Sequence, residues 1–244
     1  MTYRLLYPLA VLALLLAASG GCFPRSAGPR LAHFATTAPE VGQPAPAFTL
    51  PSVDGGEIVL ADLLGERPLV IQFGSHSCPV YRYRRHWMRD LIADYRERVG
   101  FLLVYTVEAH PQGSKSPYAE GEWNPWINRL TGIRLAQPES LDERISLAKE
   151  SRQRLGLNRP EVELPFAVDR LDDAVWREWG AASASAFVID RNGRIASRQV
   201  WIDPQEIRRA LDGLLAPRTP EPRTRETPDA PATARSAPDG GAGG

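Results

Sequence analysis

A cysteine followed by a proline ends an apolar run in this sequence, Leu69-Val-Ile-Gln-Phe-Gly-Ser-His-Ser-Cys78-Pro79. The thiolate form of cysteine is a nucleophile, and it forms most readily where the thiol lies near positive charge. The unpaired N–H groups in the first turn of a helix supply such a charge. The pattern therefore predicts that Cys78 is reactive and has a lowered pKa. A buried structural cysteine is the alternative.

The segments on either side of Cys78 are typical of a buried strand and a helix. Leu69–Gly74 is apolar and rich in β-branched residues, as in parallel strands. Pro79 suits the first helical turn, where its missing N–H costs nothing. From Val80 to Val99 the apolar residues recur at helical spacing, and Gly100 is a natural stop. The sequence thus predicts a strand, a turn that carries Cys78, and a helix.

A glutamate and a histidine follow the next apolar run, Phe101–Val107. Because the carboxyl ends of parallel strands meet at one edge of a sheet, we expect Glu108 and His110 to lie near Cys78. A histidine there can protonate a leaving carbanion or stabilise a thiolate, and a carboxylate can hold its tautomer. His76 is a further candidate for tuning the thiol. An ordinary exposed loop residue is the alternative for His110.

The cysteine count excludes dithiol chemistry within one chain. The sequence has two cysteines, and Cys22 lies far from Cys78, near the N-terminus. Tyr81 occupies the fourth position of what would be a C-x-x-C motif, so turnover needs an external thiol reductant. His33 and His86 are expected to be incidental. Because the histidines have no ligand spacing, we expect neither a metal site nor another bound cofactor.

Length and charge indicate one domain with extensions. The chain has 244 residues with 29 acidic and 29 basic side chains, which gives no reason to expect nucleic acid as a partner. The segment Arg82–Arg85 is locally basic. Such a segment is usually a solvated helix face, but beside a reactive thiol it could also attract a substrate that carries a carboxylate.

Residues 1–22 are typical of an export signal. Arg4 precedes the apolar stretch Leu5–Ala18, which is shorter than the roughly 20 residues that span a bilayer. Small residues then lead to Cys22, which resembles the lipidated cysteine of a bacterial lipoprotein. We therefore expect an exported protein, either membrane-anchored through Cys22 or located in the cell envelope. Cleavage after Ser19 and an uncleaved anchor are the alternatives.

The rest of the chain divides into a linker at 23–40, a globular domain at 41–215 and a disordered tail at 216–244, which is rich in Pro, Ala and Gly. Within the domain, Ser140 begins a helix through a capping box. The turn at 191–193 predicts a hairpin, and Pro204 begins a last helix. Parallel strands followed by a hairpin predict an α/β, thioredoxin-like fold, with a central mixed sheet and helices on both faces.

Two motifs resemble the iodothyronine deiodinase family. The segment Phe73-Gly-Ser-His-Ser-Cys78-Pro79 is similar to that family's active-site sequence F-G-S-x-T-U-P, in which U is selenocysteine. The segment Val104-Tyr-Thr-Val-Glu-Ala-His-Pro111 is similar to V-Y-I-E-E-A-H-P. Ser140-Leu-Asp-Glu-Arg144 and Trp201-Ile-Asp-Pro204 resemble later motifs. The resemblance implies a bacterial, cysteine-containing member of the family, within the thioredoxin-like superfamily.

The resemblance also assigns roles within these motifs. It gives Cys78 the role of selenocysteine, and Glu108 and His110 the acidic and histidine roles. We count four further motif residues as supporting the site, namely Ser75, His76, Ser77 and Tyr105. The sequence departs from the animal pattern in that sulfur replaces selenium, which implies a slower nucleophile. The stretch Gly113–Trp126 does not follow that pattern, and Ala184 falls near the expected cis-proline.

Three functions remain open at this point. The first is reductive dehalogenation of an iodinated aromatic molecule, with a thiol or a thioredoxin-like protein as the reductant. The second is a one-cysteine peroxidase, for which Ser75 matches the hydroxyl position of the peroxiredoxin motif but Ile71 replaces its proline. The third is a non-catalytic binding module. A dimer is compatible with each of them.

Overall fold

The structure is a computed structural model that describes residues 33–157 and 164–217. The expected signal segment at 1–22, with Cys22, and the expected tail from residue 218 lie outside the described residues. Within the described part, five strands form one sheet in the order β5-β4-β3-β6-β7. These strands are β3 (Leu69–Gly74), β4 (Gly100–Tyr105), β5 (Phe166–Val168), β6 (Ala186–Ile189) and β7 (Ile195–Gln199).

The sheet is mixed. Strand β3 pairs in parallel with β4, and β4 in parallel with β5, whereas β6 is antiparallel to both β3 and β7. The predicted turn between β6 and β7 contains Gly193 with φ of 73°, a conformation that glycine adopts without strain. Parallel strands joined by helical crossovers and followed by a hairpin form the predicted thioredoxin-like fold, which is confirmed.

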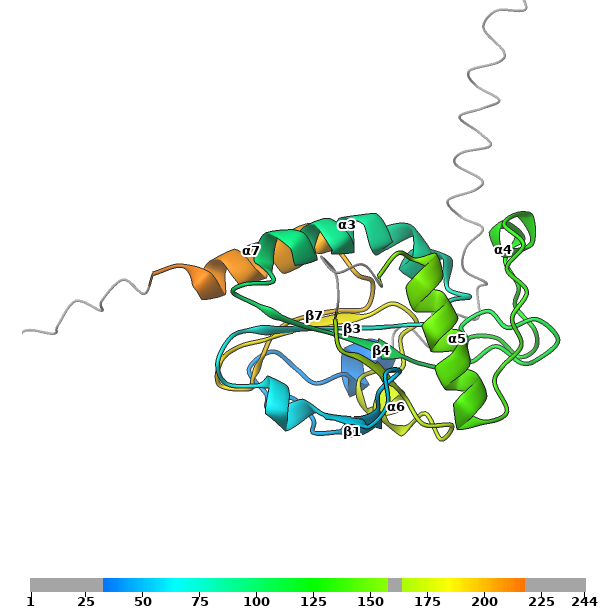
Figure 1. Ribbon diagram of the computed structural model, residues 1–244, viewed down its shortest axis with the longest axis horizontal. Helices are drawn as coiled ribbons and strands as arrows, with labels where there is room; N and C mark the ends of the chain where they lie inside the picture. The colour runs from blue at the N-terminus through cyan, green and yellow to red at the C-terminus, as the bar shows by residue number, and fades with distance from the viewer. Residues whose placement is uncertain (1–32, 158–163, 218–244) are drawn as a thin grey trace, which may run out of the picture.

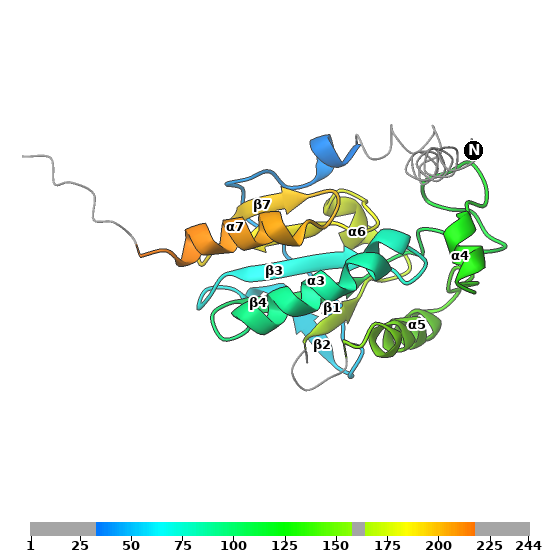
Figure 2. The ribbon, with the colours of Figure 1, turned by 90° about the horizontal axis from the view of Figure 1, so that it is seen from above.

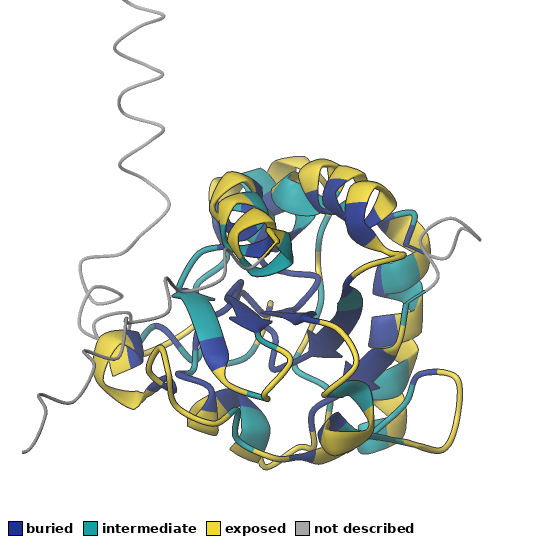
Figure 3. Cartoon of the chain, turned by 90° about the vertical axis from the view of Figure 1, so that its left-hand side faces the viewer, coloured by how far each residue is buried: buried dark blue, intermediate teal, exposed yellow. Residues whose placement is uncertain are grey.

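Helices α3 (Pro79–Tyr95), α5 (Leu141–Arg154) and α7 (Pro204–Leu215) cover one face of the sheet (Figures 1 and 2). The other face is covered by a small hairpin of β1 (Thr49–Pro51) and β2 (Glu57–Val59), by the 3₁₀ helix η1 (Leu60–Leu63) and by α6 (Ala174–Glu178). The short helix α4 (Trp126–Leu130) stands beyond the edge of the sheet. Figure 3 shows the strands as the buried centre between these layers.

Several boundaries differ from those predicted. Helix α3 ends at Tyr95, and Gly100 is the first residue of β4 rather than the stop of the helix. The reason is that Val99 already turns into the core, where it is 1% exposed, and the chain must reverse before it enters the sheet. Residues 33–37 are helical, and Phe34 and Ala38 are buried, so packed residues extend into the expected linker at 23–40.

Candidate active site

Cys78 lies between the end of β3 and the first turn of α3. It is the N-cap residue of that helix, with Pro79 at the first helical position, and its N–H donates to the carbonyl of Ser75 at 3.1 Å. The predicted strand–turn–helix geometry is therefore present. The side chain is completely buried.

Burial determines the protonation of this thiol. The Sγ–H group donates to Oγ of Ser183 at 3.5 Å, and the nearby N–H groups of Val80 and Tyr81 favour the thiolate. Loss of solvent outweighs these interactions and raises the pKa of Cys78. The expectation of a lowered pKa is therefore wrong, because it considered the helix N-terminus and not the burial of the thiol.

The loop before Cys78 is joined to the loop after β4 by three hydrogen bonds. The N–H of Ser77 donates to Oε2 of Glu108 at 2.8 Å, and the N–H of His110 donates back to Oγ of Ser77 at 2.9 Å. The N–H of Ala109 donates to Oγ of Ser75 at 3.1 Å. The serines of the first motif thus satisfy buried amides of the second motif, which explains why hydroxyl groups stand at these positions.

Glu108 acts on the cysteine loop and not on the histidine. Its carboxylate also accepts a hydrogen bond from the hydroxyl of Tyr105, which itself accepts the N–H of His76 at 3.3 Å. Gln137 pairs with both the N–H and the carbonyl of Glu108. The expectation that Glu108 fixes the tautomer of His110 is wrong, because Ser77 and Tyr105 occupy its oxygens. Burial raises the pKa of Glu108.

His110 is held by Trp123. Its Nδ1 lies 3.2 Å from the carbonyl oxygen of Trp123, and the two rings meet edge to face with centroids 4.3 Å apart. Burial lowers the pKa of His110 to about 4, so the imidazole is neutral at pH 7. A carbonyl can only accept, so Nδ1 carries the hydrogen and Nε2 keeps its lone pair.

His76 is also buried and neutral. Desolvation lowers its pKa to about 4, assisted by the charge of Arg82. Its Nδ1 lies 3.1 Å from Oγ of Ser151 on α5, and its Nε2 has no hydrogen-bond partner among the described residues. His76 therefore links the cysteine loop to α5.

Arg82 and Asn128 hold the carbonyls of the same loop. Arg82 donates to the carbonyl of His76 at 2.5 Å and to Oδ1 of Asn128 at 2.7 Å. Asn128, on α4, is completely buried and donates from Nδ2 to the carbonyl of Ser77 at 2.8 Å. Of these two residues, only Arg82 could be expected near the thiol from the sequence, because it lies one helical turn after Cys78.

Two further side chains near the thiol were not predicted. Ser183 is the hydrogen-bond partner of Sγ. Tyr118 is buried, and its hydroxyl donates to the carbonyl of Ala181 at 3.0 Å. Both come from irregular segments distant in sequence, where no periodicity marks them.

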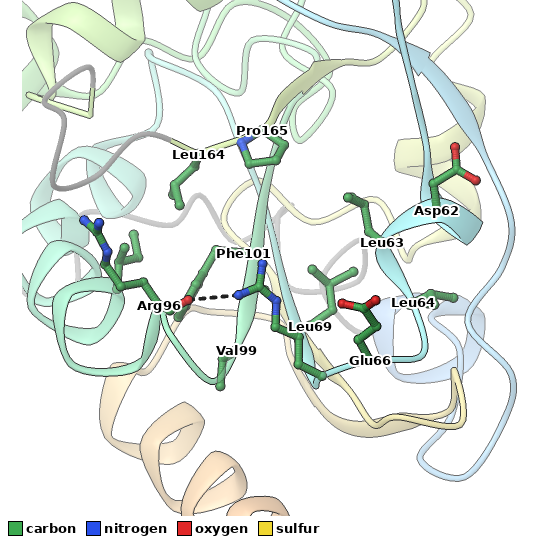
Figure 4. Close-up of a pocket in the computed structure, with 13 residues that line it drawn as sticks. Asp62, Leu63, Leu64, Glu66, Leu69, Arg96, Val99, Phe101, Leu164 and Pro165 are labelled. Carbon is green, nitrogen blue, oxygen red and sulfur yellow. Dashed lines mark hydrogen bonds between the residues drawn. The ribbon is translucent and has the colours of Figure 1, made fainter.

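One pocket of about 610 Å³ lies away from this site (Figure 4). Its lining includes Leu69 and Gly100, the first residues of β3 and β4, whereas the candidate site lies beyond the last residues of the same strands. A second pocket of about 510 Å³ is lined by residues of α3 and of the segment around α4, including Pro79 and Val80, which follow Cys78 in the sequence.

Comparison with known proteins identifies the family. The iodothyronine deiodinase family model matches residues 31–212. A thyroxine 5-deiodinase of Gallus gallus is 28% identical over 189 residues, covering 72% of this chain and 67% of that protein. The Sus scrofa enzyme of the same name is 29% identical over 150 residues, covering 61% of this chain but only 44% of its own length.

Among solved structures, a conserved protein of Geobacillus kaustophilus has a TM-score of 0.50 at 20% identity, over 72% of this chain and 82% of that one. This likeness concerns the fold alone. The family match spans both motif loops and the sheet that positions them. The chain therefore belongs to the iodothyronine deiodinase family.

Proposed function

We propose that this chain is a thiol-dependent oxidoreductase that removes iodine reductively from an aromatic molecule, with Cys78 as the nucleophile. The observation that carries the proposal is the hydrogen-bonded junction of the two motif loops, in which Ser77 links Cys78 to Glu108 and His110. Family membership supports the same reaction class.

The reaction balances with an external thiol as the reductant. The Cys78 thiolate attacks iodine, an S–I bond forms, the C–I bond breaks, and its electron pair stays on the ring carbon, which takes up a proton. A thiol then attacks Sγ and displaces iodide, leaving a mixed disulfide. A second thiol releases Cys78 and leaves as the external disulfide. One aryl iodide and two thiols thus give an arene, a disulfide, iodide and a proton.

Because His110 is neutral, it can first act as a base and then, once it is protonated, as an acid. Because Nδ1–H is bound to the Trp123 carbonyl, Nε2 is available to accept the proton of the Cys78 thiol. The resulting imidazolium can return that proton to the ring carbon. In the described structure Sγ is hydrogen-bonded to Ser183, so this transfer requires Cys78 to leave that partner when substrate enters.

Iodide release from 3-iodophenol with dithiothreitol tests the proposal. Cys78→Ser should abolish release, because a hydroxyl is a far weaker nucleophile. His110→Ala should lower the rate by roughly 10²-fold, the usual scale for a lost acid–base group, while the exposed His86→Ala should not change it. Full activity of Cys78→Ser or of His110→Ala would contradict the mechanism.

A peroxide assay on the same preparation tests the peroxidase alternative. A peroxidatic cysteine needs an accessible thiolate, whereas Cys78 is buried and its pKa is raised. We therefore expect peroxide consumption to be slow and independent of His110.

We also propose that the protein is exported and held at a membrane through a lipid on Cys22. The basis is sequence alone, because Cys22 lies outside the described residues. Among the described helices, none has the length and apolar character needed to cross a membrane. Cys22→Ser should move the protein from the membrane to the soluble fraction without changing iodide release. Retention of the variant in the membrane would contradict lipidation.

A further inference from the structure

The pocket between α3 and α4 combines an apolar wall with unpaired positive charge. Its apolar wall consists of Pro79, Val80 and Tyr83 from α3 and of Pro125, Trp126 and Ile127 at α4. Tyr83 and Trp126 are 70% and 52% exposed, which is unusual for such large rings on a water-soluble surface. The volume of about 510 Å³ is in the range of small-molecule sites.

Three arginines, Arg82, Arg84 and Arg85, line the same pocket. Arg82 is bound to the carbonyl of His76 and to Asn128, Arg84 lies 4.9 Å from the ring centroid of Trp87, and Arg85 donates to the carbonyl of Arg82. None of the three has a carboxylate partner among the described residues, and the residues that line the pocket include no Asp or Glu.

This charge pattern discriminates between ligands. A carboxylate would meet the positive charge of these guanidinium groups, while an aromatic ring would cover the exposed rings of the wall. An ammonium group would meet positive charge and find no acidic acceptor in the lining. The site therefore favours an aromatic acid over an aromatic amino acid, and disfavours an aromatic amine most.

The location connects the pocket with the thiol. Pro79 and Val80, which line it, directly follow Cys78, and Asn128 of α4 holds the carbonyl of Ser77. We propose that this pocket is the subsite for the anionic, non-reacting end of the substrate, and that it selects aromatic acids without an ammonium group. This inference rests on the proposed function for the identity of the reacting group, but the binding preference does not depend on turnover.

Three probes of one ring structure test the preference: 3-(4-hydroxy-3-iodophenyl)propionate, 3-iodotyrosine and 3-iodotyramine. Binding is measured by calorimetry on the full chain carrying Cys78→Ser, so that no reaction occurs. We expect the propionate to bind about tenfold more tightly than iodotyrosine, and iodotyramine to bind most weakly. The double variant Arg84→Gln/Arg85→Gln should reduce the preference to about twofold or less.

The control is Arg89→Gln/Arg129→Gln, which removes the same charge from α3 and α4 outside the lining of the pocket. It should leave the preference intact, and both double variants are checked by thermal melting. The subsite is overturned if the three probes bind with equal affinity. It is also overturned if the control variant loses as much of the binding preference as Arg84→Gln/Arg85→Gln does.

Iodide release by the wild-type chain separates the subsite from the proposed function. Selective binding without iodide release keeps the subsite and overturns the reaction. Iodide release together with equal binding of the three probes keeps the reaction and overturns the subsite. Alkylation of Cys78 by iodoacetamide, followed by peptide mass spectrometry, tests whether the pocket is connected with the thiol. Bound 3-(4-hydroxyphenyl)propionate, which lacks iodine and therefore cannot react with the thiol, should slow alkylation, and an unchanged rate overturns the connection of this pocket with the thiol.

Discussion

His76 and His110 expose only 4% and 6% of their surface, and burial keeps both rings neutral. In the unfolded chain a histidine binds a proton near its ordinary pKa of about 6.5. In the folded chain the pKa of each is about 4, so between these values the unfolded state binds more protons. Folding stability therefore falls as pH is lowered from about 6.5 to about 4.

Replacing His76 by glutamine should remove its share of this pH dependence. Burial raises the pKa of Asp169 to about 6, so that group acts in the opposite direction over much of the same range. The difference between wild type and His76→Gln cancels the contribution of Asp169. Urea unfolding at pH 7 and pH 4.5 should show the wild type losing about 2 kcal/mol more than the variant. Equal losses would contradict a neutral buried His76.

Gly74 is required because the ring of Tyr81 lies against it. A Cβ at this position would stand 2.1 Å from the Tyr81 ring, which is itself buried. Gly74→Ala should therefore destabilise the fold by about 2 kcal/mol or more through overpacking. Gly213→Ala is the control, because a Cβ there meets nothing within 4 Å and alanine favours the helix. Thermal melts of the two variants should shift in opposite directions.

At the scale of elements, α4 is a five-residue helix whose one fully buried side chain, Asn128, holds the loop before Cys78. Asn128→Ala leaves the carbonyl of Ser77 without this donor, and it leaves Arg82 with the carbonyl of His76 but without its acceptor on α4. We expect Cys78 to become more accessible, with alkylation by iodoacetamide about tenfold faster, while iodide release falls. Arg129→Ala, on the exposed side of α4, should change neither rate. Reduced activity with unchanged alkylation would show that Asn128 does not position the loop.

The sequence predicts elements well where local chemistry determines them. The bounds of β3 match the expected apolar run, and Ser140 caps α5 as the capping box requires, with its hydroxyl accepting the N–H of Glu143. Contacts between segments that are distant in the sequence cannot be predicted from a local sequence pattern in this way. Asn128 lies on the short helix α4, and Trp123 and Ser183 lie in irregular segments, so their places at the site depend on the complete fold. The raised pKa of Cys78 likewise depends on its burial in the folded chain.

In the molecule as a whole, residues 33–40 are part of the packed domain, because Phe34 and Ala38 are buried in its core. Phe34 contacts the ring of Phe187, with centroids 5.9 Å apart, and the guanidinium of Arg198 binds the carbonyls of Ala35 and Ala38. Because this segment closes one face of the sheet, it contributes to the stability of the fold.

Phe34→Ala should lower the free energy of unfolding by about 3 kcal/mol, as expected for a large side chain lost from a core. Val41→Ala is the control, since Val41 is 61% exposed. Denaturant unfolding of the two variants decides the matter. Similar stability of both would mean that the packed domain begins at about residue 41.

The hydrogen bonds between the two motif loops have a consequence for amide exchange. The N–H groups of Ser77, Ala109 and His110 lie outside regular strands and helices, yet each donates to a buried side chain. Loop amides usually exchange quickly with solvent deuterium, whereas these should be as slow as amides of β3 and β4. They therefore provide a reporter of local opening at the thiol in the absence of substrate, and Ser77→Ala should release the amide of His110 first.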